Sequence, residues 1–196
     1  MNVAGGTSDC PALKAAVKVH DDLWASGAIT SSMTQKQKAR VYYDWLIKHC
    51  EYDDVSANAT PDANLDGLYE ILFGGNSGFA EGSEPAEFAL IEGKAVCLGY
   101  AHAYNLLLRL EGIECVTVVC ELGRHAWSAV VLDGMLYHID TTWGDTTGAP
   151  DRYFCMTEAA AWARFGGYAK ELEYREQRRN GMEDMLEDMW KDFDWQ

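Results

Sequence analysis

The chain has 196 residues, a length that fits a single domain large enough to bury a substantial core. Hydrophobic residues make up 48% and charged residues 24% of it, which argues against a disordered or fibrous protein. The 31 acidic and 16 basic residues give a formal charge of −15, which would repel phosphate backbones, so nucleic-acid binding is not expected. The acidity is typical of a solvated surface, with attraction of basic substrates as the alternative.

The sequence shows no apolar run of the roughly 20 residues that a membrane-spanning helix needs, so no transmembrane segment is expected. Its first ten residues, MNVAGGTSDC, lack the basic and apolar regions of a signal peptide. The six cysteines show neither CxxC nor Cys/His ligand spacing, so we expect no structural zinc site and no cofactor. Three disulfides are arithmetically possible, but one reactive thiol among buried ones explains the count equally well.

The first half of the chain has helical patterns. Pro11, which follows Ser8 and Asp9, suits a helix start, and a capping-box sequence at Thr34 predicts a second helix. Residues 53–64 predict a polar loop without the spacing of a calcium-binding EF-hand. A short helix is expected over 65–73 and a Gly/Ser-rich loop over 74–85.

The second half begins with a strong helix candidate over 96–110, and strand signals follow it over 114–122, 125–132 and 135–143. Helices that precede strands favour an α+β fold with an antiparallel sheet. A last helix is expected over 157–165, followed by a charged tail over 168–195 whose apolar residues have near-helical spacing. A helix packed on its own domain is the simplest interpretation of that tail.

Cys97 lies at the start of the predicted central helix. The unpaired N–H groups and the dipole of a helix N-terminus lower the pKa of a thiol there, which favours a nucleophilic role. Gly93 and Gly99 flank it and would let a substrate carbonyl approach, so the Cys97 N–H is a natural oxyanion donor. A lone cysteine in such a place is more often a buried small hydrophobe, so the hypothesis needs a partner base.

The strands over 125–132 and 135–142 supply that partner. They are joined by Asp133-Gly134, a dipeptide favoured in two-residue type I′ hairpin turns. The resulting register would place residues whose numbers add to 267 opposite one another, which pairs Leu132 with Met135, Ala129 with His138, Trp127 with Asp140 and His125 with Thr142.

In that register His125 and Asp140 share one face of the sheet, together with Trp127 and His138. The diagonal separation of His125 and Asp140 would be roughly 7 to 8 Å between Cα atoms, which an imidazole and a carboxylate can span. The register therefore predicts a base and its orienting carboxylate, whereas a three-residue turn would place the two on opposite faces.

The remaining histidines and two tryptophans are candidates for lesser roles. His138 is a reserve base, with packing or hydrogen bonding as the favoured interpretation. Trp127 is a candidate substrate contact, although core packing explains it as well. For His20, His49 and His102 a structural role is favoured. For Trp143 packing is as plausible as a place in the wall of a cleft.

The segments GKAVCLGYAHAYNLLLRLEGI and RHAWSAVVLDGMLYHIDTTWGD, in that order, resemble the transglutaminase-like superfamily, especially its bacterial cysteine-protease-like members. The clear resemblance covers about residues 86–145. It implies a papain-like α+β core, a catalytic triad of Cys97, His125 and Asp140, and a thioester intermediate formed on a protein or peptide substrate. Two departures are Ser128, where many relatives have asparagine, and the lack of a glutamine over 38–97 that could donate to an oxyanion.

The resemblance leaves the reaction open. Hydrolysis of a peptide or isopeptide bond is the first hypothesis, and transamidation or deamidation of glutamine side chains is the second. A peptide- or cell-wall-binding module that retains the fold without turnover is the alternative from another class. We expect one domain over 1–196, with its core over about 34–166 and an acidic helical extension over 168–196.

Overall fold

The computed structural model describes residues 10–58 and 86–191, with side chains described as far as residue 181. Its order begins with α1 (Pro11–Ala25), α2 (Gln35–His49), β1 (Glu51–Tyr52), α3 (Asp54–Asn58), the π-helix η1 (Phe88–Glu92), β2 (Lys94–Ala95) and α5 (Cys97–Leu110). It continues with β3 (Cys115–Cys120), β4 (His125–Leu132), β5 (Met135–Ile139), α6 (Thr141–Thr146), the 3-10 helix η2 (Pro150–Tyr153), α7 (Glu158–Ala163) and α8 (Tyr168–Lys191). None of the helices in this part of the chain is long and apolar enough to cross a membrane.

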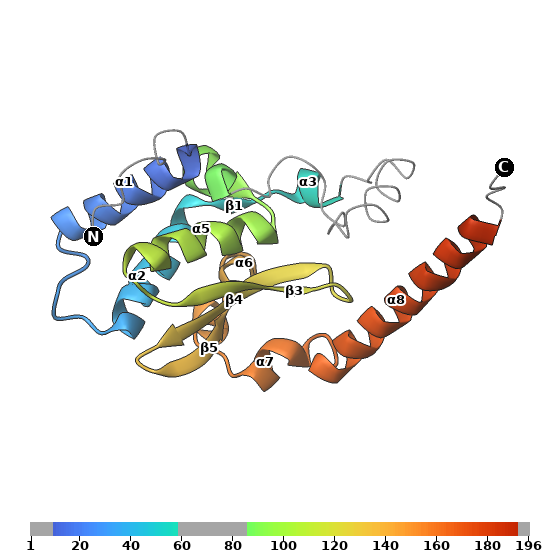
Figure 1. Cartoon of the computed structure of the whole chain (residues 1–196). Helices are drawn as coiled ribbons and strands as arrows, with labels where there is room; N and C mark the ends of the chain where they lie inside the picture. Colours follow the sequence, from blue (N-terminus) through green and yellow to red (C-terminus); the bar gives the residue numbers. More distant parts are fainter. Residues whose placement is uncertain (1–9, 59–85, 192–196) are drawn as a thin grey trace.

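The architecture is layered (Figure 1). An antiparallel meander in the order β3-β4-β5 forms the sheet, α5 packs on one of its faces, and α1 and α2 pack on α5. Alternate residues of β4 divide between two cores: Val130 and Leu132 face the helices, whereas Trp127 faces a smaller cluster with Trp162 of α7. The predicted α+β class with an antiparallel sheet is confirmed.

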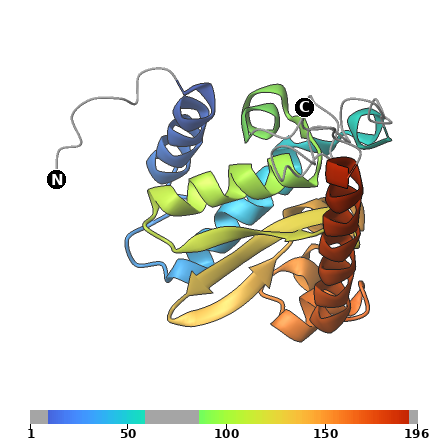
Figure 2. The same cartoon turned by 45° about the vertical axis from the view of Figure 1, so that its right-hand side comes forward.

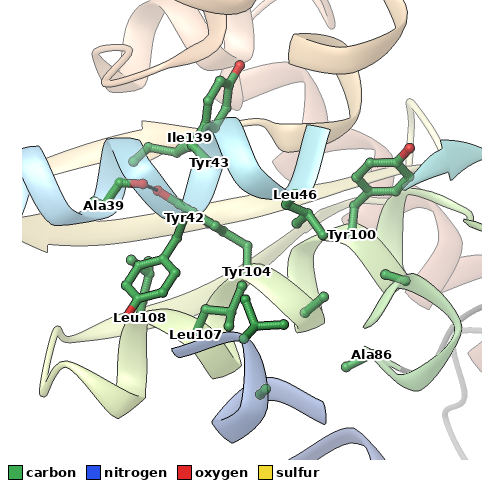
Figure 3. Close-up of a cluster of buried hydrophobic side chains, with 14 of the residues drawn as sticks. Ala39, Tyr42, Tyr43, Leu46, Ala86, Tyr100, Tyr104, Leu107, Leu108 and Ile139 are labelled. Carbon is green, nitrogen blue, oxygen red and sulfur yellow. Dashed lines mark hydrogen bonds between the residues drawn. The ribbon is translucent and has the colours of Figure 1, made fainter. Parts of the chain in front are cut away.

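Helix α2 forms because its sequence supplies both a cap and an apolar stripe. Thr34 accepts from the N–H of Gln37 at 3.3 Å, and the Gln37 side chain accepts from the N–H of Thr34 at 2.9 Å, which is the predicted capping box. The four buried residues of the helix have the spacing of one helical face. They are Ala39, Tyr42, Tyr43 and Leu46. Tyr42 points toward Leu108 of α5, whereas Tyr43 points to the other side of α2 and donates to the Pro150 carbonyl at 2.8 Å (Figure 3).

Glu111, just after α5, joins three elements through one carboxylate. It accepts hydrogen bonds from Trp24 of α1 at 2.6 Å, and from Lys38 at 2.7 Å and Tyr42 at 2.8 Å, both on α2. Burial alone would raise the pKa of Glu111, but these three donors outweigh it and lower the pKa below its ordinary value. The contact therefore ties both N-terminal helices to the end of the central helix.

Two predicted boundaries were wrong. The predicted loop over 53–64 begins with a helical turn, α3, because Asp53 caps it by accepting from the Ser56 N–H at 3.2 Å and the Ser56 hydroxyl at 2.6 Å. The last strand ends at Ile139 and not at residue 143, because Asp140 caps a new helix, α6. The rest of that loop, from residue 59, the helix predicted over 65–73 and the loop predicted over 74–85 lie outside the described residues.

The charged tail forms α8, which runs across one end of the sheet (Figure 2). Its attachment is Glu171, whose side chain is fully buried and accepts from the backbone N–H groups of Glu121 at 2.9 Å and Leu122 at 3.0 Å. Arg175, one turn later, donates to Glu171 at 2.7 Å and to the Val119 carbonyl at 2.7 Å. The first half of α8 is therefore fixed to the turn between β3 and β4.

We predict that Glu111→Gln lowers the free energy of unfolding at pH 7 by about 2 kcal/mol, because the hydrogen bonds of a charged acceptor are lost. A carboxylate with a lowered pKa contributes stability above its unfolded pKa and loses it as the pH falls through the folded value. The difference between wild type and variant should therefore shrink below about pH 4.3. Denaturant unfolding at pH 7 and at pH 3 measures this. Glu114→Gln, at an exposed position, is the control; an unchanged difference at pH 3 would contradict the prediction.

Candidate active site

Cys97 is the first residue of α5, and the backbone before it sets its position. Gly93 has a left-handed φ of 67°, and a Cβ there would come within 3.0 Å of the His49 carbonyl oxygen, so glycine is required. Lys94 and Ala95 then pair in parallel with β1, and Val96 follows in an extended conformation. This short sheet therefore fixes the start of α5.

The N-terminus of α5 offers unpaired N–H groups. Val96, the residue before the helix, makes no side-chain capping bond, and the first helical hydrogen bond runs from the Tyr100 N–H to the Val96 carbonyl at 3.1 Å. Within the described residues, no protein group accepts from the N–H of Cys97. The Cys97 side chain is 2% exposed. Free amides beside a buried thiol are the arrangement that stabilises an anion at this point.

The β4–β5 hairpin carries the histidine and the carboxylate. Asp133 and Gly134 have φ values of 50° and 82°, as a type I′ turn requires, and the register pairs Leu132 with Met135 through to Ser128 with Ile139. The predicted register is therefore confirmed over those residues.

Strand pairing ends before Asp140, so the predicted pairing of His125 with Thr142 is wrong; Thr142 lies in α6. The structure nevertheless brings His125 and Asp140 together, with 2.7 Å between Nε2 and Oδ2.

Asp140 is fixed from several sides. It is 1% exposed; Oδ1 accepts from the N–H of Trp143 at 2.9 Å, while Oδ2 binds His125. Its own N–H donates to the carbonyl of Tyr153 at 2.9 Å. One carboxylate thus caps α6 and orients the imidazole, so neither oxygen can turn away without losing a buried hydrogen bond.

His125 is buried between Asp140, Cys97 and aromatic rings. Its ring stacks on Trp143, with 4.1 Å between centroids and 5° between planes. Burial would lower the pKa of His125, but the charge and hydrogen bond of Asp140, with a further contribution from hydrogen bonding to Cys97, raise it to about 9. Since Nε2 binds Asp140, Nδ1 is the nitrogen left for the thiol.

Trp127 does not line an open site. It is 2% exposed, packs edge-on against Trp162 at 4.9 Å between centroids, and donates from Nε1 to Nδ1 of His138 at 2.8 Å. The expected substrate contact at Trp127 therefore finds no support in this geometry. The packing and hydrogen-bonding role predicted for His138 is confirmed, and burial lowers its pKa.

The other histidines lie on helices and make contacts there. His49 stacks on Trp45, with 4.5 Å between ring centroids, and its Nδ1 lies 2.7 Å from the Trp45 carbonyl oxygen. His20 lies 3.0 Å from the neighbouring Asp21 carboxylate. His102 borders a pocket on α5 whose lining includes Asn105 but none of the three candidate triad residues.

Tyr52 was missed by the sequence reasoning. It lies on β1 opposite Ala95, two residues before Cys97. Burial and the charge of Cys97, together with two nearby aspartates, raise its pKa to about 12, so its hydroxyl keeps its proton near neutral pH. No local sequence pattern places Tyr52 beside Cys97, because the pairing of β1 with β2 is a tertiary contact.

Comparison with known proteins gives one decisive match. Residues 23–141, more than half of the chain, match the family described as the Transglutaminase-like superfamily. The chain belongs to this superfamily. Cys97, His125 and Asp140 all lie inside the matched region, and the transglutaminase-like fold agrees with the helices and small antiparallel sheet seen here. The superfamily is generally enzymatic, so membership suggests cysteine-dependent acyl transfer or peptidase activity.

Individual relatives are distant. The chain is 25% identical over 137 residues to the kyphoscoliosis peptidase of Homo sapiens, covering 63% of this chain and 18% of that protein. It is 26% identical over 157 residues to the Mus musculus protein of the same name, covering 71% of this chain and 21% of that protein. The chain therefore spans about a fifth of the length of these curated relatives. A structure titled as the crystal structure of a TGase has a TM-score of 0.49 and 15% identity, covering 72% of this chain and 34% of that one.

We predict that at pH 6 iodoacetamide alkylates Cys97 about tenfold faster than it alkylates Cys10, because a protonated His125 stabilises the thiolate. Cys10 is exposed and provides a reference thiol in the same chain. Peptide mass spectrometry after timed quenching gives both rates. The variant His125→Gln, checked for folding by circular dichroism, should slow the reaction at Cys97 alone; equal Cys97 rates in the two proteins would contradict activation by the imidazole.

Proposed function

We propose that this protein hydrolyses peptide or isopeptide amide bonds through a triad of Cys97, His125 and Asp140. The observation that carries the proposal is the buried contact of His125 with Asp140 at 2.7 Å, beside a thiol at a helix N-terminus. A nucleophile, a base within reach and a fixed group that orients the base are the parts that covalent acyl transfer requires.

The reaction would begin with Cys97 as thiolate and His125 as imidazolium. Sγ attacks the amide carbonyl carbon, and the oxyanion that forms accepts the N–H of Cys97. The C–N bond then breaks as His125 gives its proton to the leaving amine, which leaves a thioester on Sγ. His125 next takes a proton from water, whose hydroxyl attacks the thioester, and the departing thiolate restores the starting pair.

Tyr52 is our candidate for the second oxyanion donor. Its hydroxyl retains its proton because its pKa is about 12, and its strand pairs with the residue two positions before Cys97. A neutral phenol can donate to a developing negative charge without a change of protonation state. This assignment fills the role for which the sequence between residues 38 and 97 offered no glutamine.

Water, and not a second amine, is proposed as the acyl acceptor because both mammalian relatives are named peptidases. Transamidation or deamidation of glutamine shares every step up to the thioester, so it remains the second candidate. To separate them, a denatured protein rich in glutamine is incubated with the enzyme and a labelled primary amine. New amino termini without incorporated label support hydrolysis, and label in the protein supports transamidation.

We predict that Cys97→Ala abolishes turnover and that Asp140→Asn lowers kcat by about 10³- to 10⁴-fold, since the imidazole loses the group that fixes its tautomer. Tyr52→Phe should lower kcat by about 10²-fold with little change in KM, as expected for an oxyanion donor. Release of new amino groups from a denatured protein measures all three. Turnover that survives in Cys97→Ala would refute the triad, whereas substrate binding with no turnover in wild type would indicate a binding module.

For pH dependence, His125 has a raised pKa of about 9, so the imidazolium persists through neutral pH. We predict that kcat/KM falls as the pH rises through about 9, because the proton needed by the leaving amine is lost. Initial rates between pH 6 and 10 test this, with circular dichroism at each pH to show that the fold persists. A rate that keeps rising to pH 10 would contradict the assignment of His125 as the acid.

A further inference from the structure

A pocket of about 640 Å³ adjoins the proposed catalytic site. Its lining includes Trp143, Arg152, Tyr153, Met156 and Arg164. Trp143 is the ring on which His125 stacks at 4.1 Å, and its backbone N–H binds Asp140. Trp143 therefore belongs both to the lining of the pocket and to the surroundings of the proposed base.

Two arginines give the pocket its charge. The guanidinium of Arg164 lies 4.2 Å from the ring centroid of Trp143, and that of Arg152 lies 5.7 Å from the ring centroid of Tyr153. Within the described part of the chain, neither arginine pairs with a carboxylate, and the residues that line this pocket include no acid. An arginine held over an aromatic face keeps its N–H edges free for a bidentate acceptor.

The surroundings of these two arginines differ from those of Arg40 and Arg175. Acidic residues outnumber basic ones by 31 to 16 in this chain. Arg40 forms an ion pair with Asp44, and Arg175 forms one with Glu171. Even Asp151, the neighbour of Arg152 in sequence, directs its carboxylate to Arg40. The pocket thus presents two cations beside apolar side chains, in a protein with a formal net charge of −15.

We propose that this pocket binds the carboxylate side chain of a glutamate or aspartate in the substrate, and so selects acidic residues at a fixed position near the scissile bond. The guanidinium groups of Arg152 and Arg164 would bind the carboxylate, while Trp143 and Met156 pack against its methylene groups. This inference rests on the proposed hydrolytic function for its effect on turnover, but the binding itself does not require catalysis.

The first experiment maps cleavage sites in a denatured protein by mass spectrometry and then compares peptides that carry Glu, Gln or Lys at each position around the cut. Wild type should prefer Glu over Gln about tenfold in kcat/KM at one position. Arg164→Gln and Arg152→Gln should each lower kcat/KM on the Glu peptide more than on the Gln peptide, and so reduce that preference. Arg179→Gln, at an exposed position on α8, removes the same charge elsewhere and should retain the full preference.

If the arginine variants lose kcat/KM equally on the Glu, Gln and Lys peptides, the proposal is overturned, because an equal loss would indicate a structural effect through Trp143. A Glu preference that persists in the Arg152→Gln, Arg164→Gln double variant would overturn it as well.

Binding is tested separately from turnover, so that failure of the proposed function can be recognised. Fluorescence anisotropy of labelled peptides that differ only in one Glu or Gln is measured on Cys97→Ala. About tenfold tighter binding of the Glu peptide, lost in Cys97→Ala combined with Arg164→Gln, supports the pocket even if wild type cleaves nothing. Equal affinity for both peptides would overturn it even if wild type hydrolyses them.

Discussion

The carboxylate of Asp140 is the contact on which the candidate site depends. One oxygen binds Nε2 of His125 at 2.7 Å and the other accepts from the N–H of Trp143 at 2.9 Å. The end of the sheet, the start of α6 and the orientation of the imidazole are therefore set by one buried group. Trp143, placed by that cap, stacks on His125 and limits its rotation. Asp140 is 1% exposed, so solvent screens its carboxylate little. The carboxylate therefore stabilises an imidazolium at His125, although His125 is itself buried.

The site also depends on residues beyond the region that defines the family. The match ends at residue 141, yet the carbonyl of Tyr153 holds the N–H of Asp140, and Met156 bonds to His138 along the outer edge of β5. The segment that follows, through η2 and α7, packs on the sheet face that carries His125 and supplies both arginines of the adjoining pocket. The matched region thus carries the three candidate triad residues, whereas the later residues supply the arginines of the pocket for which we propose a role in substrate preference.

The contacts that stabilise the helical layer involve other residues than the candidate triad. Helix packing around Glu111 and Tyr42 joins the end of α5 to α1 and α2, at a distance from the candidate triad. His125 and Asp140, by contrast, form a buried pair whose contribution to the free energy of unfolding depends on pH. Because the pKa of His125 is raised, the pair stabilises the fold fully below about pH 6.5, and this stabilisation is lost as the pH rises through about 9. The N-terminal helices therefore provide stability at pH values where the candidate triad provides less.

The sequence alone determined the main helices and strands and the register of the β4–β5 hairpin, which directs His125 toward Asp140. A capping box at Thr34, a helix beginning at Cys97 and a two-residue Asp133-Gly134 turn act over short distances, so their consequences can be derived from neighbouring residues. The tertiary structure decided the end of β5, the burial of Trp127, and the approach of Tyr52 to Cys97. It also gathered Arg152 and Arg164 in the lining of one pocket. The burial of Trp127, the position of Tyr52 and the grouping of the arginines depend on which distant segments pack together, since their contacts are completed by atoms that no local pattern places. The end of β5 depends instead on a competition, in which the local cap of Asp140 on the Trp143 N–H replaced further strand pairing.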